Sequence, residues 1–509
     1  MRCITKWLRK AGEFMYSVII AFGVASAMLC MGLILRAKLK FFQKMLMPVC
    51  VIGGIMGFIL MNLIMPHFKA GFTVKDFSNI VDVFFVFSFI SIGLTGSKKK
   101  KKTEEKSSNG VIRGAMGMAL VWCILYAIQP LVGIGITSVL GKAVNMDAMY
   151  GILIPFAFCQ GPGQASTYGR IFQNVYGYKN AEMVALTFAV FGFIAAFAIG
   201  VPIAKIGLKK GLGKSKTKIN DAVERGYFVP EEQRESIGKS TTHSANVESI
   251  AIHFALMGIC YLIALGLAKI ISFVPLLGPT FAAMLFFWGM MAAYIVKAVM
   301  RKFNCEYLIN NIFQARITGF LSDYLVVCAF MAIQVGMIGK WIIPIIVVSV
   351  VDAVLTAVIC LYFSARFGSD HDFERFLGLY GTSTGTTPSG VSLLRMVDPR
   401  LQTPTGGELG MMNMGMMFST ATMIFITLAG LKTLSLPVAC IGMALSVIVY
   451  LILLKVFRVW KKPTFSLTKG RIHADGEEDD DSTFLRGFLN DPTVGSSIPL
   501  EDALNGSVK

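Results

Sequence analysis

Charged residues are scarce in this chain. Only 15% of its 509 residues are Asp, Glu, Lys or Arg, against about 25% in ordinary globular proteins, whereas 55% are hydrophobic. This composition, with a mean hydropathy of +0.65, excludes a soluble protein. Apolar stretches of roughly 20 residues recur from residue 14 to residue 460, which also excludes a protein with a single membrane anchor. The sequence therefore predicts a helical protein that crosses a membrane many times.

Clusters of reactive side chains are lacking as well. The ten cysteines stand singly, mostly in apolar stretches, and the histidines form no ligand group. This pattern excludes a disulfide framework, a redox pair and a Cys/His metal site. No nucleophile stands with a base, as an enzyme would require, and no continuous polar stripe marks a channel pore. We expect neither an enzyme nor an organic cofactor.

Acidic residues are outnumbered by basic ones. The 30 Asp and Glu face 48 Lys and Arg, for a net charge of +18. In a soluble protein this excess would suggest nucleic acid, but here the basic residues lie in short loops between apolar stretches and report membrane topology. We expect no nucleic-acid partner. The run Lys98 to Lys102 is interpreted as a cytoplasmic anchor, with contact to anionic membrane lipid as its second possible role.

Eleven apolar windows are candidate membrane spans. They cover residues 14–35, 46–65, 80–96, 111–140, 180–206, 249–272, 277–300, 316–338, 341–365, 407–431 and 436–460. Two further stretches, 151–172 and 376–396, are interrupted by Gly, Pro, Ser and Thr, which suit a lipid-facing helix poorly. We interpret both as re-entrant hairpins, which return to the side from which they entered.

The basic loops then set the orientation. With the Lys98 to Lys102 run in the cytoplasm, the positive-inside rule holds at almost every loop, and the C-terminus is cytoplasmic. The first hairpin then enters from outside and the second from inside. The N-terminus lies outside in this arrangement, although its own basic residues disagree with the rule: Arg2, Lys6, Arg9 and Lys10.

The two halves of the chain repeat the same order of elements: four spans, a hairpin and one span. Residues 1–206 and 249–431 form the halves, joined by a cytoplasmic linker at 207–248 and followed by an extra span at 432–460 and a cytoplasmic tail at 461–509. Because five is odd, the second half must be inverted. A shift of 241 residues also matches Asp82 to Asp323 and Val86 to Val327. The expected fold class is an all-α polytopic membrane protein with two inverted five-span repeats, an architecture typical of secondary transporters.

The hairpin tips are the candidate substrate site. Backbone N–H and C=O groups at membrane depth need a polar partner, and donors without carboxylates favour a small anionic substrate. The alternative is that small and hydroxyl residues only allow close helix packing. The candidate substrate-binding residues are Gly161, Gly163, Gln164, Ser166 and Thr167 in the first hairpin and Thr384, Gly385, Thr386, Thr387 and Ser389 in the second.

Carboxylates inside spans are candidates for ion chemistry. Asp352 lies mid-span, where it is a cation ligand, a proton carrier or a paired structural charge, and Thr356 one turn away could add an oxygen. Glu182, Glu408 and Asn413 lie near the starts of the spans that follow each hairpin, where a helix N-terminal role is an equal alternative.

The chain resembles the bacterial sodium/glutamate symporter family. The resemblance is densest in PFAFCQGPGQASTYGRIFQNVYGYKNAEMVALTFAVFGFIAAFAIGVPIA at 155–204, with weaker support from MPVCVIGGIMG, FFVFSFISIGL and GTSTGTTP. It implies Gly161 and Gly163 as hairpin glycines, and it adds Asn180 beside Glu182 to the tentative sodium residues. It further implies a homodimer, a bacterial plasma membrane and an elevator movement of a hairpin-bearing domain. Family members typically carry Gly-Gly-His-Gly-Thr at the first tip, where this chain has QGPGQ.

The expected function is sodium-coupled symport, with sodium as coupling ion, of glutamate or a similar small carboxylate. Because the histidine is missing from the first tip, the exact substrate stays open. The alternatives are a di- or tricarboxylate transporter of related fold and, from another class, a non-transporting membrane sensor or a channel.

Overall fold

A computed structural model describes residues 2–45, 47–68, 71–95, 108–213, 236–275, 278–334, 336, 339–398, 403–412, 418–468 and 470–472, with backbone alone at 2–15 and 108–110. This part of the chain is helical except for one small antiparallel hairpin, β1 (Phe465–Ser466) and β2 (Gly470–Arg471). The helices and helical turns are α1 (Arg2–Lys38), α2 (Lys40–Lys44), α3 (Val49–Ile59), η1 (Leu60–Ile64), η2 (Met65–His67), α4 (Val74–Leu94), α5 (Ser108–Leu140), η3 (Gly141–Val144), η4 (Ala148–Leu153), α6 (Ile154–Phe158), α7 (Pro162–Asn174), α8 (Ala181–Lys209), α10 (Ser249–Ile271), α11 (Gly278–Ala283), α12 (Leu285–Lys302), η6 (Glu306–Leu308), α13 (Asn311–Met331), η7 (Gly339–Trp341), α15 (Ile342–Ser364), α16 (Asp372–Ser383), α17 (Thr387–Val397), α18 (Thr405–Met412), α19 (Thr420–Gly430) and α20 (Leu436–Val456).

Nine stretches of the described chain are long and apolar enough to span a membrane. They are Tyr16–Lys38, Val49–His67, Val74–Leu94, Val111–Val144, Ala181–Lys209, Ser249–Ile271, Asn311–Met331, Gly339–Ser364 and Leu436–Val456. They correspond to nine of the eleven expected spans. The third begins earlier than expected because Thr73 and Asp76 form a capping box that opens α4.

The other two expected spans are divided. The window 277–300 is broken at Met284, whose ψ of 56° ends α11 before α12 begins. The indole Nε1 of Trp288 donates to the Phe281 carbonyl oxygen at 2.8 Å, so a side chain satisfies a carbonyl near the break. The window 407–431 contains the short helices α18 and α19, and residues 413–417 between them lie outside the described part. The expectation of a continuous helix across 277–300 is therefore wrong.

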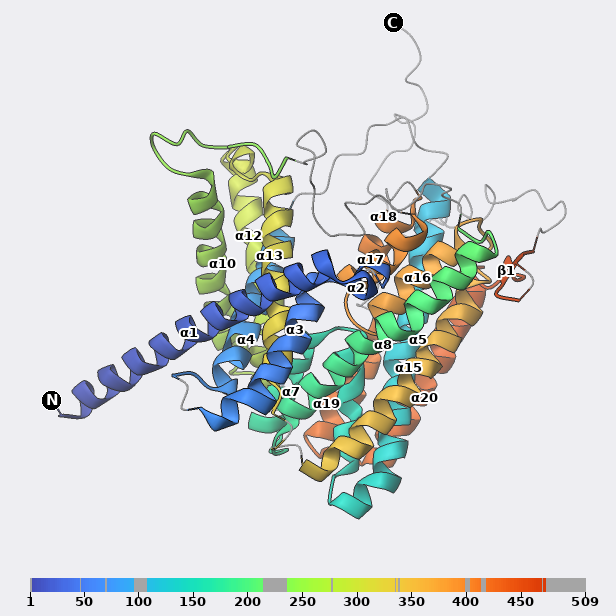
Figure 1. Cartoon of the computed structure of the whole chain (residues 1–509), viewed down its shortest axis with the longest axis horizontal. Helices are drawn as coiled ribbons and strands as arrows, with labels where there is room; N and C mark the ends of the chain where they lie inside the picture. The colour runs from blue at the N-terminus through green and yellow to red at the C-terminus, as the bar shows by residue number, and fades with distance from the viewer. Residues whose placement is uncertain are drawn as a thin grey trace, which may run out of the picture.

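The helices form two groups that lie side by side in Figure 1. The first bundle contains α1, α3, α4, α10, α12 and α13, in which α4 packs on α12 and α13, and α3 packs on α1 and α13. The second bundle contains α5 to α8 and α15 to α20, in which α5 packs on α15, α18 and α20, and α15 packs on α8 and α16. Contacts between the bundles include those of α7 with α4 and α13.

Two helix–turn–helix units occupy the positions of the expected hairpins. In the first helix pair, η4 and α6 lead through a turn at 159–161 into α7; in the second helix pair, α16 leads through 384–386 into α17. Gly161 has φ +82°, a backbone conformation that residues with a Cβ rarely adopt, and Pro162 then starts α7. The indole Nε1 of Trp122 on α5 holds the first turn by donating to the Cys159 carbonyl oxygen at 3.0 Å.

Candidate transport site

The two helix pairs meet at their turns. A Cβ placed on Gly161 would lie 2.5 Å from Thr386 Cγ2 and 2.9 Å from the Gly385 carbonyl oxygen. Gly192 of α8 packs on the Thr384 carbonyl oxygen, and only a residue without a Cβ leaves room for that approach. The structure therefore brings the first tip against two of the five candidate residues of the second tip, Gly385 and Thr386, while a third, Thr384, lies against α8.

The hydroxyl groups of the second tip are engaged locally. Thr384 Oγ1 donates to the Tyr380 carbonyl oxygen at 2.8 Å, and the hydroxyls of Thr386 and Ser389 lie 3.3 Å apart at the start of α17. Thr387 is the first residue of that helix. The N-termini of α7 and α17 thus both lie where the two helix pairs touch.

Gly163 and Ser166 lie on another face of α7. Gly163 packs directly against the ring of Phe85 on α4, and Ser166 Oγ donates to Asp82 Oδ1 at 2.7 Å. Gly163 therefore faces the first bundle, and Ser166 lies between Asp82 of that bundle and Glu182 of α8, to which its Oγ also donates at 3.0 Å. Gln164 is 4% exposed, and its Oε1 has no hydrogen-bond partner among the described residues, while Thr167 is half-buried on the same helix.

Arg170 connects α7 to both neighbouring carboxylates. Its Nε contacts Glu182 Oε1 at 2.7 Å, its Nη1 forms an ion pair with Asp82 Oδ2, and its Nη2 donates to Ser78 Oγ at 2.7 Å. Ser78 also donates to Glu182. Arg170 therefore supplies a positive charge to Glu182 through its Oε1, and the assignment of this carboxylate to sodium stays a prediction.

Asp352 lies in a contrasting environment. Its side chain is completely buried on α15, and neither carboxylate oxygen has a hydrogen-bond partner among the described residues. Thr356, four residues on, accepts from Gln129 Nε2 at 3.0 Å. Gln129 Nε2 also lies 3.4 Å from the Ser383 carbonyl oxygen at the end of α16, and Gln129 Oε1 accepts from Cys159 Sγ at 3.3 Å. A buried carboxylate thus lies on the same helix as a threonine linked to both tips.

A hard cation that takes oxygen ligands suits the position of Asp352 better than a transition-metal ion does. No group of three or more His, Cys, Asp or Glu that could hold a metal ion occurs among the described residues. An unpaired buried carboxylate is costly, and a hard cation with oxygen ligands would neutralise it. Asp352, Thr356 and the Gln129 and Ser383 oxygens are groups of that type.

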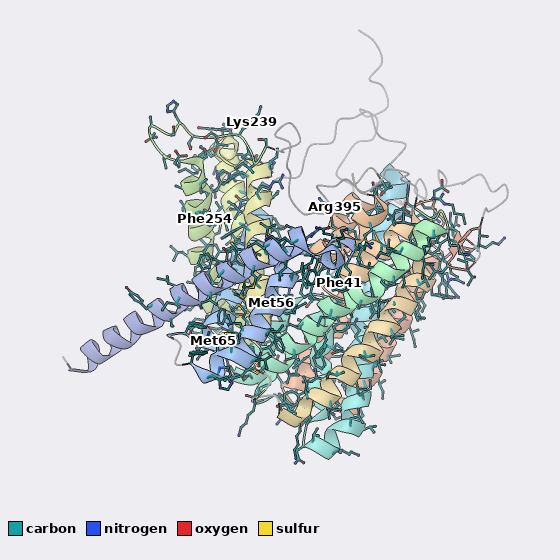
Figure 2. The ribbon with its side chains drawn as sticks, viewed as in Figure 1. Phe41, Met56, Met65, Lys239, Phe254 and Arg395 are labelled. Atoms are coloured by element: carbon teal, nitrogen blue, oxygen red, sulfur yellow. The ribbon has the colours of Figure 1, made fainter. Side chains whose placement is uncertain are left out.

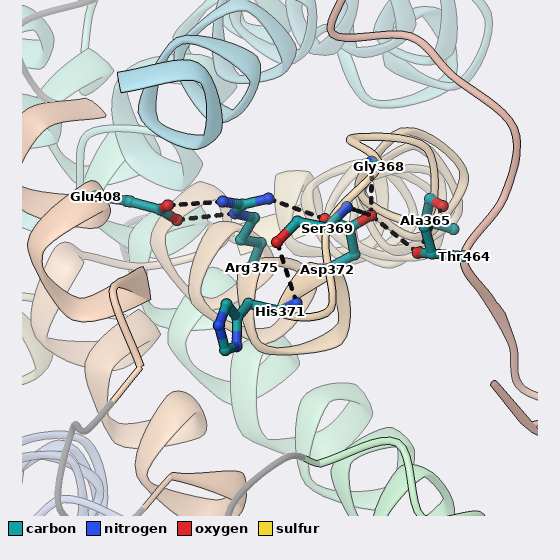
Figure 3. Close-up of polar contacts among 8 residues, drawn as sticks. All are labelled: Ala365, Gly368, Ser369, His371, Asp372, Arg375, Glu408 and Thr464. Carbon is teal, nitrogen blue, oxygen red and sulfur yellow. Dashed lines mark hydrogen bonds and ion pairs between the residues drawn. The ribbon is translucent and has the colours of Figure 1, made fainter. Parts of the chain in front are cut away.

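Glu408 belongs to a separate buried cluster (Figure 3). Its two oxygens accept from Nε and Nη2 of Arg375 at 2.8 and 2.7 Å, and Arg375 Nη1 binds Asp372 Oδ1 at 3.0 Å. Asp372 Oδ2 in turn accepts from two backbone N–H groups and from Thr464 Oγ1. A bidentate guanidinium thus satisfies the Glu408 carboxylate, and the assignment of Glu408 to sodium stays a prediction.

Of the two remaining candidate sodium residues, Asn180 is the one that lies in the described part of the chain. Asn180 is the N-cap of α8 with φ 59°, and its side chain makes no capping hydrogen bond. Asn413 lies outside the described residues. Arg395, at the end of α17, is exposed and lies toward the same upper end of the view as Lys239, away from Met65 (Figure 2).

Sequence reasoning missed Gln129, Asp372 and Arg375. Gln129 stands beside Pro130 in the middle of a long apolar stretch, and a mid-span amide of this kind is a signal that could have found it. Asp372 and Arg375 are spaced three apart at the start of α16, which places them on one helix face.

Comparisons with known proteins find relatives over most of the chain. The sequence model of the family described as sodium/glutamate symporter matches residues 14–402. The sodium/glutamate symporter of Escherichia coli (strain K12) is 22% identical over 380 residues, covering 74% of this chain and 88% of that protein. The one from Haemophilus influenzae is 22% identical over 397 residues, covering 76% and 90%.

A solved structure is also similar. A sodium proton antiporter from Methanocaldococcus jannaschii is 15% identical, covers 82% of this chain and 99% of that one, and has a TM-score of 0.33, at which the likeness carries no argument. The family match and the nine apolar helices indicate a multi-pass membrane protein. Because the family model covers most of its length, the chain belongs to the sodium/glutamate symporter family.

Proposed function

We propose that this protein is a sodium-coupled symporter for glutamate or a similar small carboxylate. The observation that carries the proposal is the meeting of the two helix-pair tips near a buried carboxylate that lacks a partner among the described residues. The named function of the family relatives supports the same transport class.

The tips supply a site for an anion. Helices α7 and α17 both begin at the contact between the pairs, and the N-terminal end of a helix carries unpaired N–H groups and a partial positive charge. A substrate carboxylate near Gly161, Thr386 and Ser389 would accept hydrogen bonds from these N–H groups. Gln164 adds a buried amide on α7.

Sodium would bind at Asp352. The ion supplies the positive charge that this carboxylate lacks, with Thr356 and nearby carbonyl oxygens as further ligands. Gln129 contacts Thr356, and it also contacts Ser383 and Cys159 at the turns of the two helix pairs. Ion binding at Asp352 and Thr356 would therefore alter the contacts of both turns. This arrangement couples the ion to the substrate site.

The inverted repeat and the elevator movement are part of the proposal. Equivalent helices pack alike in the two halves: α3 on α13 resembles α12 on α4, and α5 on α18 resembles α15 on α8. In this scheme the pairs are re-entrant, the second bundle carries substrate against the first, and two chains form a dimer in a bacterial plasma membrane with the C-terminus inside. Residues 1–206 and 249–431 are the two repeats.

Uptake into proteoliposomes tests the function. Purified protein is given labelled glutamate, aspartate, dicarboxylates, citrate and a neutral amino acid, with and without an inward sodium gradient. We expect saturable uptake of glutamate or a related carboxylate that requires sodium. Uptake of citrate or dicarboxylates alone would establish the rival di- or tricarboxylate transporter, and no gradient-driven uptake of any compound would contradict symport.

A further inference from the structure

Helices α4 and α7 face each other along two matching stripes. On α4 the stripe is Ser78, Asp82 and Phe85, and on α7 it is Arg170, Ser166 and Gly163. Phe85 packs on Gly163, Asp82 accepts from Ser166, and Ser78 accepts from Arg170. Because the residue numbers rise on one helix as they fall on the other, the stripes are antiparallel, and they form a polar seam between the two bundles.

Arg170 is shared between the bundles. Asp82 belongs to α4 in the first bundle, whereas Glu182 belongs to α8, which packs on α7 within the second bundle. A movement of one bundle along the other would separate Arg170 from Asp82 but leave it paired with Glu182. The guanidinium therefore keeps a counter-charge in either position.

The second arginine cluster shows the contrast. Arg375, Asp372 and Glu408 have side chains exposed by 4%, 1% and 0%, and all three belong to the second bundle. Arg170, Asp82 and Glu182 are exposed by 27%, 23% and 18%. Breaking an ion pair that the protein encloses completely is expensive because each freed charge is left without a partner, whereas a pair with partly exposed side chains is less tightly enclosed. The Arg375 cluster thus suits a permanent anchor, and the Arg170 cluster suits a contact that breaks.

We propose that Asp82 and Arg170 form a breakable latch between the bundles, which holds the first helix pair against α4 in the state seen here and opens when the second bundle moves. This inference rests on the proposed transport function. In it Arg170 is a positioning residue, and Glu182 retains the arginine while the latch is open.

Cross-linking tests the latch. In a cysteine-free background, Asp82→Cys with Arg170→Cys is joined by a short bifunctional methanethiosulfonate reagent, before and after adding sodium and the transported substrate. We expect the cross-link to reduce uptake at least tenfold, with recovery in reductant, and its yield to fall when sodium and substrate are present. The matched control is Ser91→Cys with Thr318→Cys, whose hydroxyls lie 2.7 Å apart on α4 and α13 within the first bundle. Its cross-link should leave both uptake and yield unchanged.

A milder variant guards against misfolding. Asp82→Asn keeps the side-chain shape and leaves Arg170 paired with Glu182. The rate of hydrogen–deuterium exchange in peptides from 162–174 should rise at least threefold, while the rate in peptides from 372–397 should stay constant. Normal uptake by the cross-linked protein, or unchanged exchange in Asp82→Asn, would overturn the latch. Absence of sodium-driven uptake in the unmodified protein would instead overturn the proposed function, and the exchange measurement would still decide the latch.

Discussion

Gly161 and Thr386 touch although 225 positions separate them in the sequence. A Cβ on Gly161 would lie 2.5 Å from Thr386 Cγ2, so the glycine both permits the positive φ of its turn and leaves room for the second helix pair. The two requirements have different consequences. Strain at the backbone is a local cost, whereas crowding at the contact changes how the tips meet.

A matched pair of substitutions separates these effects. Gly161 and Gly177 have φ of +82° and +84°, but nothing lies within 4 Å of a Cβ on Gly177. Both Gly→Ala changes should cost about 1 kcal/mol of backbone strain. Only Gly161→Ala should also reduce uptake, by at least tenfold, measured in proteoliposomes at equal protein content. Equal uptake by the two variants would show that the tip contact is dispensable for transport.

The positions of the apolar helices along the chain were largely predictable from sequence. Long apolar runs without charge identify a spanning helix, because few other structures satisfy their backbone groups inside lipid. Nine of the expected spans are helices of this kind in the described part of the chain. The break at Met284 was not predictable, because neither Met284 nor its direct neighbours are glycine or proline. The indole of Trp288, which donates to the Phe281 carbonyl oxygen seven residues earlier, is not by itself a signal that ends a helix.

The site was predictable only in part. Asp352 was singled out because a mid-span carboxylate is expensive wherever the helix packs. Glu182 and Glu408 lie near the starts of their spans and each pairs with an arginine, and which group a carboxylate pairs with depends on which helix faces meet. Gly163 and Ser166 show the same limit, since the turn sequence did not indicate which face of α7 contacts α4.

Glu408→Gln should lower stability without altering sodium dependence. The change keeps the shape of the side chain but removes one of the two carboxylates that neutralise the buried Arg375, and breaking a buried pair costs about 3–5 kcal/mol. Thermal unfolding in detergent should shift to lower temperature equally with and without sodium. A raised sodium requirement for uptake in this variant would place Glu408 in the ion site.

The segment after α20 should contribute measurably to stability. Thr464 Oγ1 donates to Asp372, its backbone N–H donates to the Ala365 carbonyl oxygen at 2.7 Å, and the ring of Phe465 packs edge-on against Phe373. Phe465 is 5% exposed, so Phe465→Ala should cost about 3–5 kcal/mol. Thermal unfolding measures the loss. The control is Phe41→Ala, whose ring is 64% exposed and whose removal should leave the midpoint nearly unchanged.

Thiol labelling from outside the cell should divide the loops by side. Asn145, which is exposed after η3, lies in a loop that the basic-residue pattern places outside, and Ser244, which is exposed before α10, lies in the linker placed inside. In a cysteine-free background, a membrane-impermeant maleimide should modify a cysteine at 145 and not one at 244. The reverse pattern would invert the proposed orientation.

Asp352→Asn provides a direct test of ion coupling. The carboxylate is buried without a hydrogen-bond partner among the described residues, so the sodium-free protein carries an uncompensated charge that sodium would neutralise. Asparagine keeps the shape and removes that charge. The sodium concentration for half-maximal uptake should therefore rise at least tenfold, equivalent to about 1.4 kcal/mol of lost binding free energy.

Asp352→Asn should also change the thermal stability of the protein, in a way that depends on sodium. Sodium that binds the folded protein raises its unfolding temperature by mass action, so the unmodified protein should be stabilised by added sodium and Asp352→Asn should not. In the absence of sodium the variant should unfold at a higher temperature, because it no longer buries an unpaired carboxylate. Asp147→Asn is the control, since Asp147 is exposed and caps η4 by accepting from the Met149 N–H at 2.8 Å. Sodium stabilisation that survives in Asp352→Asn would place the ion elsewhere and leave Asp352 as a structural residue.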